Sequence, residues 1–238
     1  MNELLNMAIN TQGGMNNWGK YYNAKVHLLV GGILWEMKGH RDTISKVEVN
    51  VDLIEQKASH KPNEEWHTIY TPHTVKIEKS NGDLIEEFSN PRVSFKGHAL
   101  ETKWSTLQLA YFAGYAMWNY INAPFLFARA GFEVNEIEAW NENGEPWRCL
   151  KVKWPENVHT HSREQTLYID KEGFIRRLDY QVEIAGNTAA SHYLYDYKDV
   201  NGIKMATRRV VYATGEDNKA RLDGPVIVSI DLSDIKLS

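Results

Sequence analysis

The sequence predicts a mainly β protein. We expect a single antiparallel half-barrel or open barrel with an N-terminal helix and a central aromatic helix packed on the concave side. Short strand-like segments recur along most of the chain, and several pairs of them flank an Asn-Gly turn. Trp104–Ala130 differs, because its aromatic and apolar residues recur at helical spacing. A long antiparallel sheet must curl, since flat sheets with exposed edges aggregate. We therefore expect the sheet to curve around this helix.

The composition is that of one globular domain covering residues 1–238. Hydrophobic residues make up 42% and charged residues 24% of the chain, which is ordinary for a soluble protein. No low-complexity linker or charge block divides it. The formal net charge is −4 and no basic patch stands out, so a nucleic-acid partner is not expected.

The N-terminal residues and the cysteine content predict a cytoplasmic protein. The first residues lack the basic and apolar regions of a secretory signal. Cys149 is the only cysteine, which excludes an intramolecular disulfide framework and fits a reducing compartment. It lies in the strand-like run Arg148–Trp154, so we expect a buried and inert thiol.

The first half of the chain begins with a short amphipathic helix and continues as strands. Gly13-Gly14 ends the helix. Ser45–Leu53 alternates strictly between apolar and polar residues, which indicates a half-buried antiparallel strand. The elements expected here are a helix over residues 3–12, strands at Ala24–Val30 and Ser45–Leu53, and a hairpin of Thr74–Ile77 and Leu84–Phe88 around Asn81-Gly82.

Gly31-Gly32 interrupts this strand pattern. The pair is expected to break the preceding strand or to form a β-bulge, because glycine permits close backbone approach. Trp35 follows shortly afterwards. It either caps a cavity or belongs to an ordinary bulge at a corner of the barrel.

The aromatic helix is expected to run from Trp104 to Asn122 and to end before Pro124. A helix that is apolar on all sides is normally buried or lies in a membrane. Here Gln108 and Asn119 interrupt an apolar run that is too short and too polar to cross a bilayer, so no transmembrane segment is predicted. Core packing and a cavity for an apolar or aromatic molecule both fit this composition.

The second half of the chain is almost entirely strand-like. Its strands pair across short turns that contain glycine. The elements expected are hairpins of Glu133–Trp140 with Trp147–Trp154, Arg163–Asp170 with Phe174–Ile184, and Ser191–Asp199 with Ile203–Tyr212, followed by a last strand at Val226–Leu232. Together with the first half, they suggest one long antiparallel meander.

Two stretches resemble the superfamily of lipoprotein-localisation factors (LolA/LolB-like proteins). The first is the N-terminal helix with Gly13-Gly14 and Trp18, leading into Ala24–Val30; the second comprises Tyr168–Tyr180 and Tyr195–Tyr212. The resemblance implies an unclosed β half-barrel covered by helices, with a cavity. The central aromatic block instead resembles a bacterial family in which the same block recurs. The superfamily also resembles a cofactor-free enzyme of the violacein pathway, so the fold does not choose between carrier and catalyst.

The best polar cluster lies in Glu156–Gln165. If this segment is a strand, His159, His161, Arg163 and Gln165 share one face. These histidines could form hydrogen bonds on the wall of the barrel. His161, or His192 on a later strand, could act as a general acid or base. The three imidazoles could also chelate a metal ion, but no fixed spacing supports this, and we predict no metal.

A second polar group contains Arg176, Arg177 and Asp179, together with Arg208 and Arg209. Arg177 and Asp179 share a face of their strand. One interpretation is an ion-pair ladder on the outer surface of the sheet. The other is an inward Arg177 that binds a carboxylate or another anionic head group.

Several common sites are not predicted. The Gly-Gly pairs lack the remaining positions of a phosphate-binding loop, so NAD, FAD and ATP are not expected, and no cofactor is predicted. His192 and Asp196 are four residues apart on a strand, about 13 Å, which is too far for a local Ser-His-Asp arrangement. A nucleophile elbow is also missing from the sequence.

The sequence thus favours a protein that binds an apolar or aromatic small molecule in an aromatic-lined cavity. The residues expected to contact the ligand are Trp35, Trp104, Tyr111, Tyr115, Trp118, Tyr120, Arg163, Gln165 and Arg177. The alternative is a cofactor-free enzyme on the same scaffold, with His161, His192 or His159 in acid–base roles. A third hypothesis is a protein–protein module with the aromatic block exposed.

Overall fold

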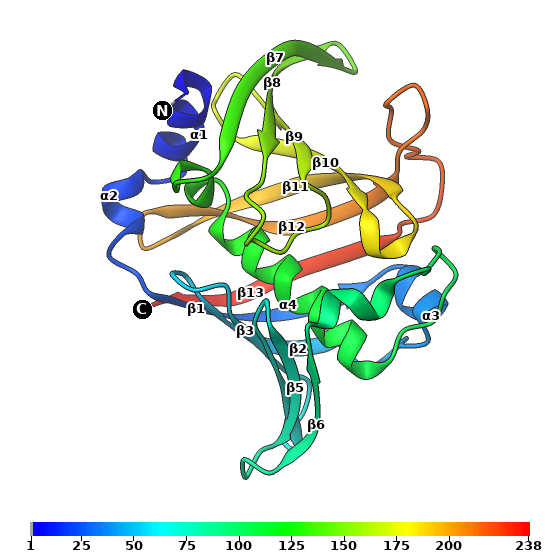
Figure 1. The fold of residues 1–238 in the computed structure, drawn as a ribbon. Coiled ribbons are helices and arrows are strands. Elements are labelled where there is room, and N and C mark those ends of the chain that lie inside the picture. Colours follow the sequence, from blue (N-terminus) through cyan, green and yellow to red (C-terminus); the bar gives the residue numbers. More distant parts are fainter. Residues whose placement is uncertain (1) are drawn as a thin grey trace.

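The computed structural model describes residues 2–238. Its strands form one 13-stranded antiparallel sheet that curves strongly but stays open (Figure 1). The aromatic helix α4 (Thr106–Asn122) crosses the concave side of this sheet. The predicted mainly β open half-barrel with a central helix is therefore confirmed.

The strands follow the curvature in the order β6-β5-β4-β3-β2-β1-β13-β12-β11-β10-β9-β8-β7. In chain order they are β1 (Asn23–Gly31), β2 (Lys46–Asp52), β3 (Ala58–Lys61), β4 (Trp66–Tyr70), β5 (Thr74–Lys79), β6 (Leu84–Ser89), β7 (Glu133–Glu142), β8 (Glu145–Lys153), β9 (Glu164–Ile169), β10 (Ile175–Val182), β11 (Thr188–Val200), β12 (Ile203–Ala213) and β13 (Val228–Leu237).

The helices lie at the start of the chain and between the strands. They are α1 (Glu3–Thr11), α2 (Met15–Trp18), α3 (Leu34–Lys38) and α4, with short 3-10 helices η1 (Pro91–Phe95), η2 (Phe125–Ala128) and η3 (Glu183–Ala185). No helix within residues 2–238 is long and apolar enough to cross a membrane.

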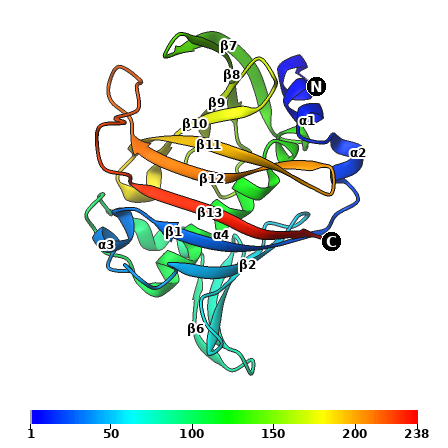
Figure 2. The ribbon, with the colours of Figure 1, turned by 180° about the vertical axis from the view of Figure 1, so that it is seen from behind.

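The strand order corrects the expectation of one continuous meander. The sheet consists of two meanders, β1–β6 and β7–β13, which α4 and its flanking 3-10 helices connect. The first and last strands pair with each other at the centre of the sheet, where Leu28 lies opposite Leu232 (Figure 2). The edges are therefore β6 and β7. No turn joins β1 to β13, so no local signal in the sequence marks this pairing.

The predicted hairpins form at their predicted turns. Asn143-Gly144 and Asn201-Gly202 have positive φ at both residues, as a two-residue hairpin turn requires. The alternation within β2 is also confirmed, because Val47, Val49 and Val51 are all buried. The short strands β3 and β4 were not predicted, since they are brief and rich in polar residues.

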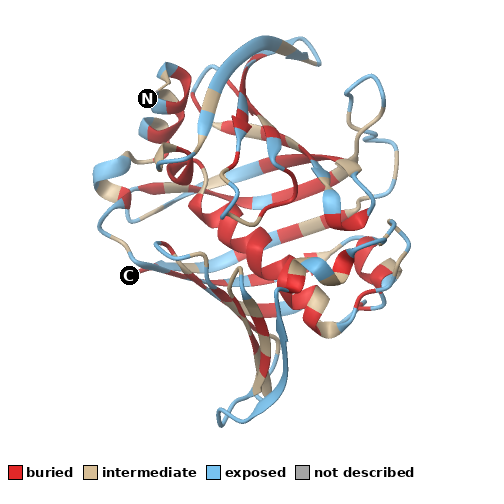
Figure 3. Cartoon of the chain, viewed as in Figure 1, coloured by how far each residue is buried: buried red, intermediate tan, exposed pale blue. Residues whose placement is uncertain are grey.

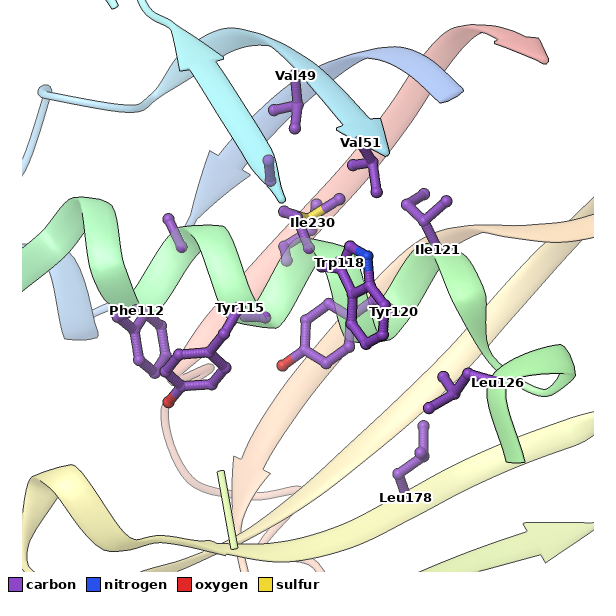
Figure 4. Packing of buried hydrophobic residues seen from close by; sticks show 14 of the residues in the cluster. Val49, Val51, Phe112, Tyr115, Trp118, Tyr120, Ile121, Leu126, Leu178 and Ile230 are labelled. Atoms are coloured by element: carbon purple, nitrogen blue, oxygen red, sulfur yellow. The ribbon is translucent and has the colours of Figure 1, made fainter. Parts of the chain in front are cut away.

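α4 begins with a capping box in which Ser105 and Gln108 exchange hydrogen bonds between side chain and backbone. Almost every residue of this helix is buried, as Figure 3 shows. Gly114 allows the closest approach to the sheet, because a Cβ atom there would lie 2.3 Å from the Cβ of Tyr70. Figure 4 shows Val49 and Ile230 beside the helix.

α4 does not lie exposed on the surface, so the structure gives no support to an exposed aromatic docking block. The N-terminal helices complete the cover, since Trp18 of α2 stacks on Phe125 of η2 with 4.4 Å between ring centroids. Cys149 is buried, as predicted, in a small cluster on the outer face of the sheet.

Trp35 lies on a helix rather than at a β-bulge. β1 ends at Gly31, and Gly32 has a φ of 103° at the start of the turn that leads into α3. Trp35 is buried there, and its indole N–H donates a hydrogen bond to the carbonyl oxygen of Gly31 (2.8 Å). The Gly-Gly pair thus ends the strand and folds α3 back over the concave side.

Candidate functional site

An apolar cavity lies between α4 and the concave face of the sheet. Its volume is about 120 Å³. Residues of β1, β2, β3, β10, β11, β12 and β13 form its floor, and α3, residues 100–104 and Ala185 cover it. Engineered apolar cavities of about 150 Å³ accept benzene. The central cavity, as we name it, is therefore of a size to take an aromatic ring or a short alkyl group.

One face of α4 forms the wall of the central cavity. Phe112, Ala116 and Tyr120 line it at a spacing of four residues, together with Ala113 and Met117. The small alanine side chains leave the space that larger residues would fill. Because α4 is held by the capping box and by its contact with Tyr70, this wall is positioned by the core of the protein.

Two tryptophans close one end of the central cavity. The ring of Trp104 lies 4.9 Å from that of Phe112, and the ring of Trp35 lies 6.2 Å from it in an edge-to-face arrangement. Both tryptophans line the cavity. Of the aromatic residues predicted to contact a ligand, the structure thus brings together Trp35, Trp104 and Tyr120.

The wall also contains polar atoms without a partner. Both ring nitrogens of His60 and the indole nitrogen of Trp104 are buried and form no hydrogen bond within residues 2–238. Such atoms are rare in folded proteins, because each loses its hydrogen bonds to water. Burial lowers the pKa of His60 to about 4, so the imidazole is neutral near pH 7. Sequence reasoning missed His60, since β3 carries no strong strand signal.

Lys38 of α3 holds the cover in place. Its side chain is buried, and its Nζ donates hydrogen bonds to the carbonyl oxygens of Leu100 and of Thr102 (3.1 Å). It also lies 4.5 Å from the centroid of the Trp104 ring. Burial lowers the pKa of this ammonium group to about 8. Lys38 thus fixes residues 99–104 against α3.

A buried network of tyrosine and histidine side chains borders the central cavity. His161 lies between two tyrosines: its Nδ1 is 3.1 Å from the hydroxyl of Tyr115, and its Nε2 is 2.8 Å from that of Tyr120. Tyr120 also contacts the hydroxyl of Tyr180 (3.2 Å), which lies 3.4 Å from Nδ1 of His192. The His161 ring stacks on Tyr180 with 4.2 Å between centroids.

Burial keeps this network neutral. It lowers the pKa of His161 to about 3 and that of His192 well below its usual value. It raises the pKa of Tyr120 to about 12. A general acid or base works best when its pKa lies near the working pH. In this arrangement, the side chains act as neutral hydrogen-bonding groups.

His159 belongs to a different group. Its Nδ1 lies 2.9 Å from the hydroxyl of Tyr111, which accepts a hydrogen bond from Arg92 (3.3 Å). Burial and the charge of Arg92 lower the pKa of His159 to about 4. His159 and His161 lie in the loop before β9, not on a strand as the sequence suggested. They contact different tyrosines of α4, because His159 contacts Tyr111, whereas His161 contacts Tyr115, one helical turn further on, and Tyr120.

Three of the predicted contact residues have structural partners away from the central cavity. Trp118 donates its indole N–H to the carbonyl oxygens of Asp52 (2.8 Å) and Glu55 (2.7 Å). The Gln165 amide donates to the hydroxyl of Thr160 (2.6 Å). Arg163 donates to backbone carbonyls in the loop before β9, at distances of 3.2 Å and 3.4 Å.

Arg177 lies on the outer face of the sheet, because its neighbour Leu178 faces the core. Its guanidinium forms two hydrogen bonds with Asp179 (2.7 and 2.6 Å) and one with Glu142 (3.1 Å). The side chain is fully buried and lies over the ring of Tyr168, 4.7 Å from its centroid. This matches the outer ion-pair interpretation, and Arg177 does not face the central cavity.

Comparisons with known proteins find similar solved structures. No family model matches the chain, and no curated protein does. A LolA superfamily protein from Nitrosomonas europaea has 8% identity and a TM-score of 0.45, with 98% of this chain and 92% of that chain covered. A DUF1329 family protein from Desulfovibrio piger has 9% identity and a TM-score of 0.45, with 99% and 92% covered.

The lipoprotein LppX from Mycobacterium tuberculosis has 10% identity and a TM-score of 0.30, with 99% of this chain and 96% of that chain covered. All three solved structures thus have a loose structural likeness to this chain, at 8–10% sequence identity and with TM-scores of 0.30–0.45.

Proposed function

We propose that this protein binds an apolar or aromatic small molecule in the central cavity. The observation that carries the proposal is the cavity itself, an apolar space between α4 and the concave face of the sheet. Protein interiors are normally packed to crystal density, with few voids larger than a water molecule. A void of about 120 Å³ costs stability, and a ligand that fills it recovers the lost contacts.

The polar atoms in the wall suggest a ligand with one hydrogen-bonding group. His60 and Trp104 have unused hydrogen-bonding capacity, and a carbonyl or hydroxyl group of the ligand would use it. The aromatic end formed by Trp35, Trp104 and Phe112 suits a ring or an alkyl chain. Of the residues predicted from the sequence, we assign ligand contact to Trp35, Trp104, Tyr120 and His161, all of which line the cavity.

A cofactor-free enzyme on the same scaffold is the second candidate. One observation favours it: His161, Tyr120 and Tyr180 line the central cavity and are hydrogen-bonded to one another, so they would touch a bound molecule. The low pKa of His161 weighs against proton transfer near pH 7. Catalysis would be favoured over binding alone if the wild type converts a bound ligand and His161→Gln binds that ligand without converting it.

The binding proposal is tested by filling the cavity. Benzene, whose single ring matches the size of the central cavity, is titrated calorimetrically into the wild-type protein and into Ala116→Leu. The added side chain occupies the cavity, so we expect the probe to bind the wild type and to lose at least about tenfold in affinity in the variant, which corresponds to about 1.4 kcal/mol.

Ala139→Leu is the matched control, because it adds the same atoms at an exposed position of β7. It should bind the probe as the wild type does. Equal binding by Ala116→Leu, with its fold verified by circular dichroism, would exclude the central cavity as the binding site.

A further inference from the structure

Arg209 is a buried guanidinium without a counterion among residues 2–238. It lies on β12 opposite Leu194 of β11 and Ile230 of β13, and its side chain faces the interior. Only 5% of the residue is exposed. Nη2 donates a hydrogen bond to the carbonyl oxygen of Tyr120 (3.0 Å), while Nε has no partner within residues 2–238.

Arg177 shows how the same chain neutralises a buried arginine. That guanidinium is paired with the carboxylates of Asp179 and Glu142. Arg209 forms no salt bridge with any residue between positions 2 and 238, and the guanidinium lies 5.1 Å from the centroid of the Tyr120 ring. A buried charge is normally paired, because its loss of hydration is costly. Since arginine stays protonated in proteins, an anion from outside the chain would complete this site.

A second, smaller cavity lies beside Arg209. Its volume is about 20 Å³, which is room for one water-sized group such as the end of a carboxylate or a small ion. Gln12, Tyr197 and Lys204 line it together with Arg209 and Tyr120. Lys204 is paired with Asp199 (3.3 Å). We name this space the Arg209 cavity.

Tyr120 separates the two cavities, because it lines both. The neighbours of Arg209 on the same face of the sheet, Val211 and Ile230, line the central cavity. The carboxylate of a molecule in the central cavity would reach Arg209 if the Tyr120 ring turned aside, which would break its hydrogen bonds to His161 and Tyr180. The charge of Arg209 also reaches the network, where it is the second cause, after burial, of the lowered pKa of His192.

We propose that the Arg209 cavity binds a carboxylate-sized monoanion, which supplies the missing counterion of this guanidinium. The anion is either the carboxylate end of an apolar acid in the central cavity or a small free ion. The first source rests on the proposed function, and the second does not.

The experiment compares two ligands that differ in charge. Octanoate and 1-octanol are used to displace benzene at pH 7.5, followed by calorimetry, in a buffer whose background anion is gluconate, too large for the Arg209 cavity. Acetate and chloride are tested separately for their effect on the melting temperature. Each measurement is made on the wild type, Arg209→Met, Arg209→Lys and Arg208→Met.

Arg208→Met is the matched control, because Arg208 is the next residue of β12 and is exposed. Arg209→Met should fold, since apolar replacement of a buried charge is often neutral or stabilising. Arg209→Lys keeps the positive charge, so it shows whether the charge alone is enough to bind the anion.

For a ligand carboxylate, octanoate should bind the wild type and Arg208→Met about tenfold more tightly than 1-octanol, as one charge-assisted hydrogen bond allows. This preference should disappear in Arg209→Met. For a free ion, the two octyl compounds should compete equally, while acetate or chloride stabilises the wild type but not Arg209→Met. Either result supports the site.

The proposal is overturned if neither octanoate nor the small anions distinguish Arg209→Met from Arg208→Met. Failure of benzene and of both octyl compounds to bind would instead overturn the proposed function, and the small-anion measurements would then decide on the Arg209 site alone.

Discussion

His60, His159, His161 and His192 are polar side chains in an apolar interior, and burial lowers the pKa of each imidazole. The tyrosine hydroxyls around them replace part of the hydrogen bonding to water that burial removes. Those within hydrogen-bond distance of a histidine nitrogen belong to Tyr111, Tyr115, Tyr120 and Tyr180. Neither ring nitrogen of His60 has such a partner in the described part of the chain, residues 2–238. The residues that distinguish this core are therefore neutral histidines.

These histidines make the stability sensitive to acid. The pKa of His161 is about 3 in the folded protein, whereas unfolded imidazoles titrate near 6.5. Between about pH 6.5 and pH 3 the unfolded chain binds the proton and the folded chain does not. The contribution of His161 to the free energy of unfolding should thus be fully present above pH 6.5 and decrease as the pH is lowered towards 3.

Urea denaturation between pH 7 and pH 5 measures this slope before most carboxylates titrate. His161→Gln should reduce the slope by about one proton, or about 1.4 kcal/mol per pH unit. An unaltered slope in His161→Gln would show that His161 is not held neutral.

At the scale of elements, α4 and α3 with the segment of residues 99–104 enclose the central cavity. The sequence predicts α4 well, because its capping box and aromatic spacing are local features. It does not predict the cover, which depends on Lys38, a residue more than 60 positions from the carbonyls that it binds. It also misplaces His159 and His161 on a strand, since alternation in a short segment does not distinguish a strand from an extended loop.

Lys38→Met should loosen this cover. The substitution removes the donor for the carbonyls of Leu100 and Thr102, which costs about 1–3 kcal/mol for buried groups left unsatisfied. Hydrogen exchange of residues 99–104 should therefore become at least about tenfold faster. Lys103→Met, at an exposed position of the same segment, is the control. Unchanged exchange in Lys38→Met would mean that other contacts hold the segment.

At the scale of the whole molecule, the fold depends on the pairing of its two terminal strands. The hairpins of both meanders follow from turn chemistry, which acts between neighbouring residues. The pairing of β1 with β13 joins segments about 200 residues apart, and only the burial of matching apolar faces selects it. The sequence therefore predicts the curved sheet and its helix, but not the strand order that places Arg209 beside Tyr120.

Hydrogen exchange distinguishes the observed strand order from a single meander in chain order. In the structure, β1 and β13 lie at the centre of the sheet, where each is bonded on both sides, and β6 and β7 are the edges. Amides of β1 and β13 should thus exchange among the slowest and those of β6 and β7 among the fastest. A meander in chain order would make β1 and β13 the edges, and fast exchange in both would contradict the observed pairing.

The central claim is that the space between α4 and the sheet accepts an apolar ligand. A crystal of the protein soaked with iodobenzene tests it most directly, because anomalous scattering locates the iodine. The account predicts a peak in the central cavity, against Phe112, Ala116 and Tyr120, and its loss in Ala116→Leu. A cavity that stays empty while iodine binds elsewhere, or a peak that persists in Ala116→Leu, would contradict it.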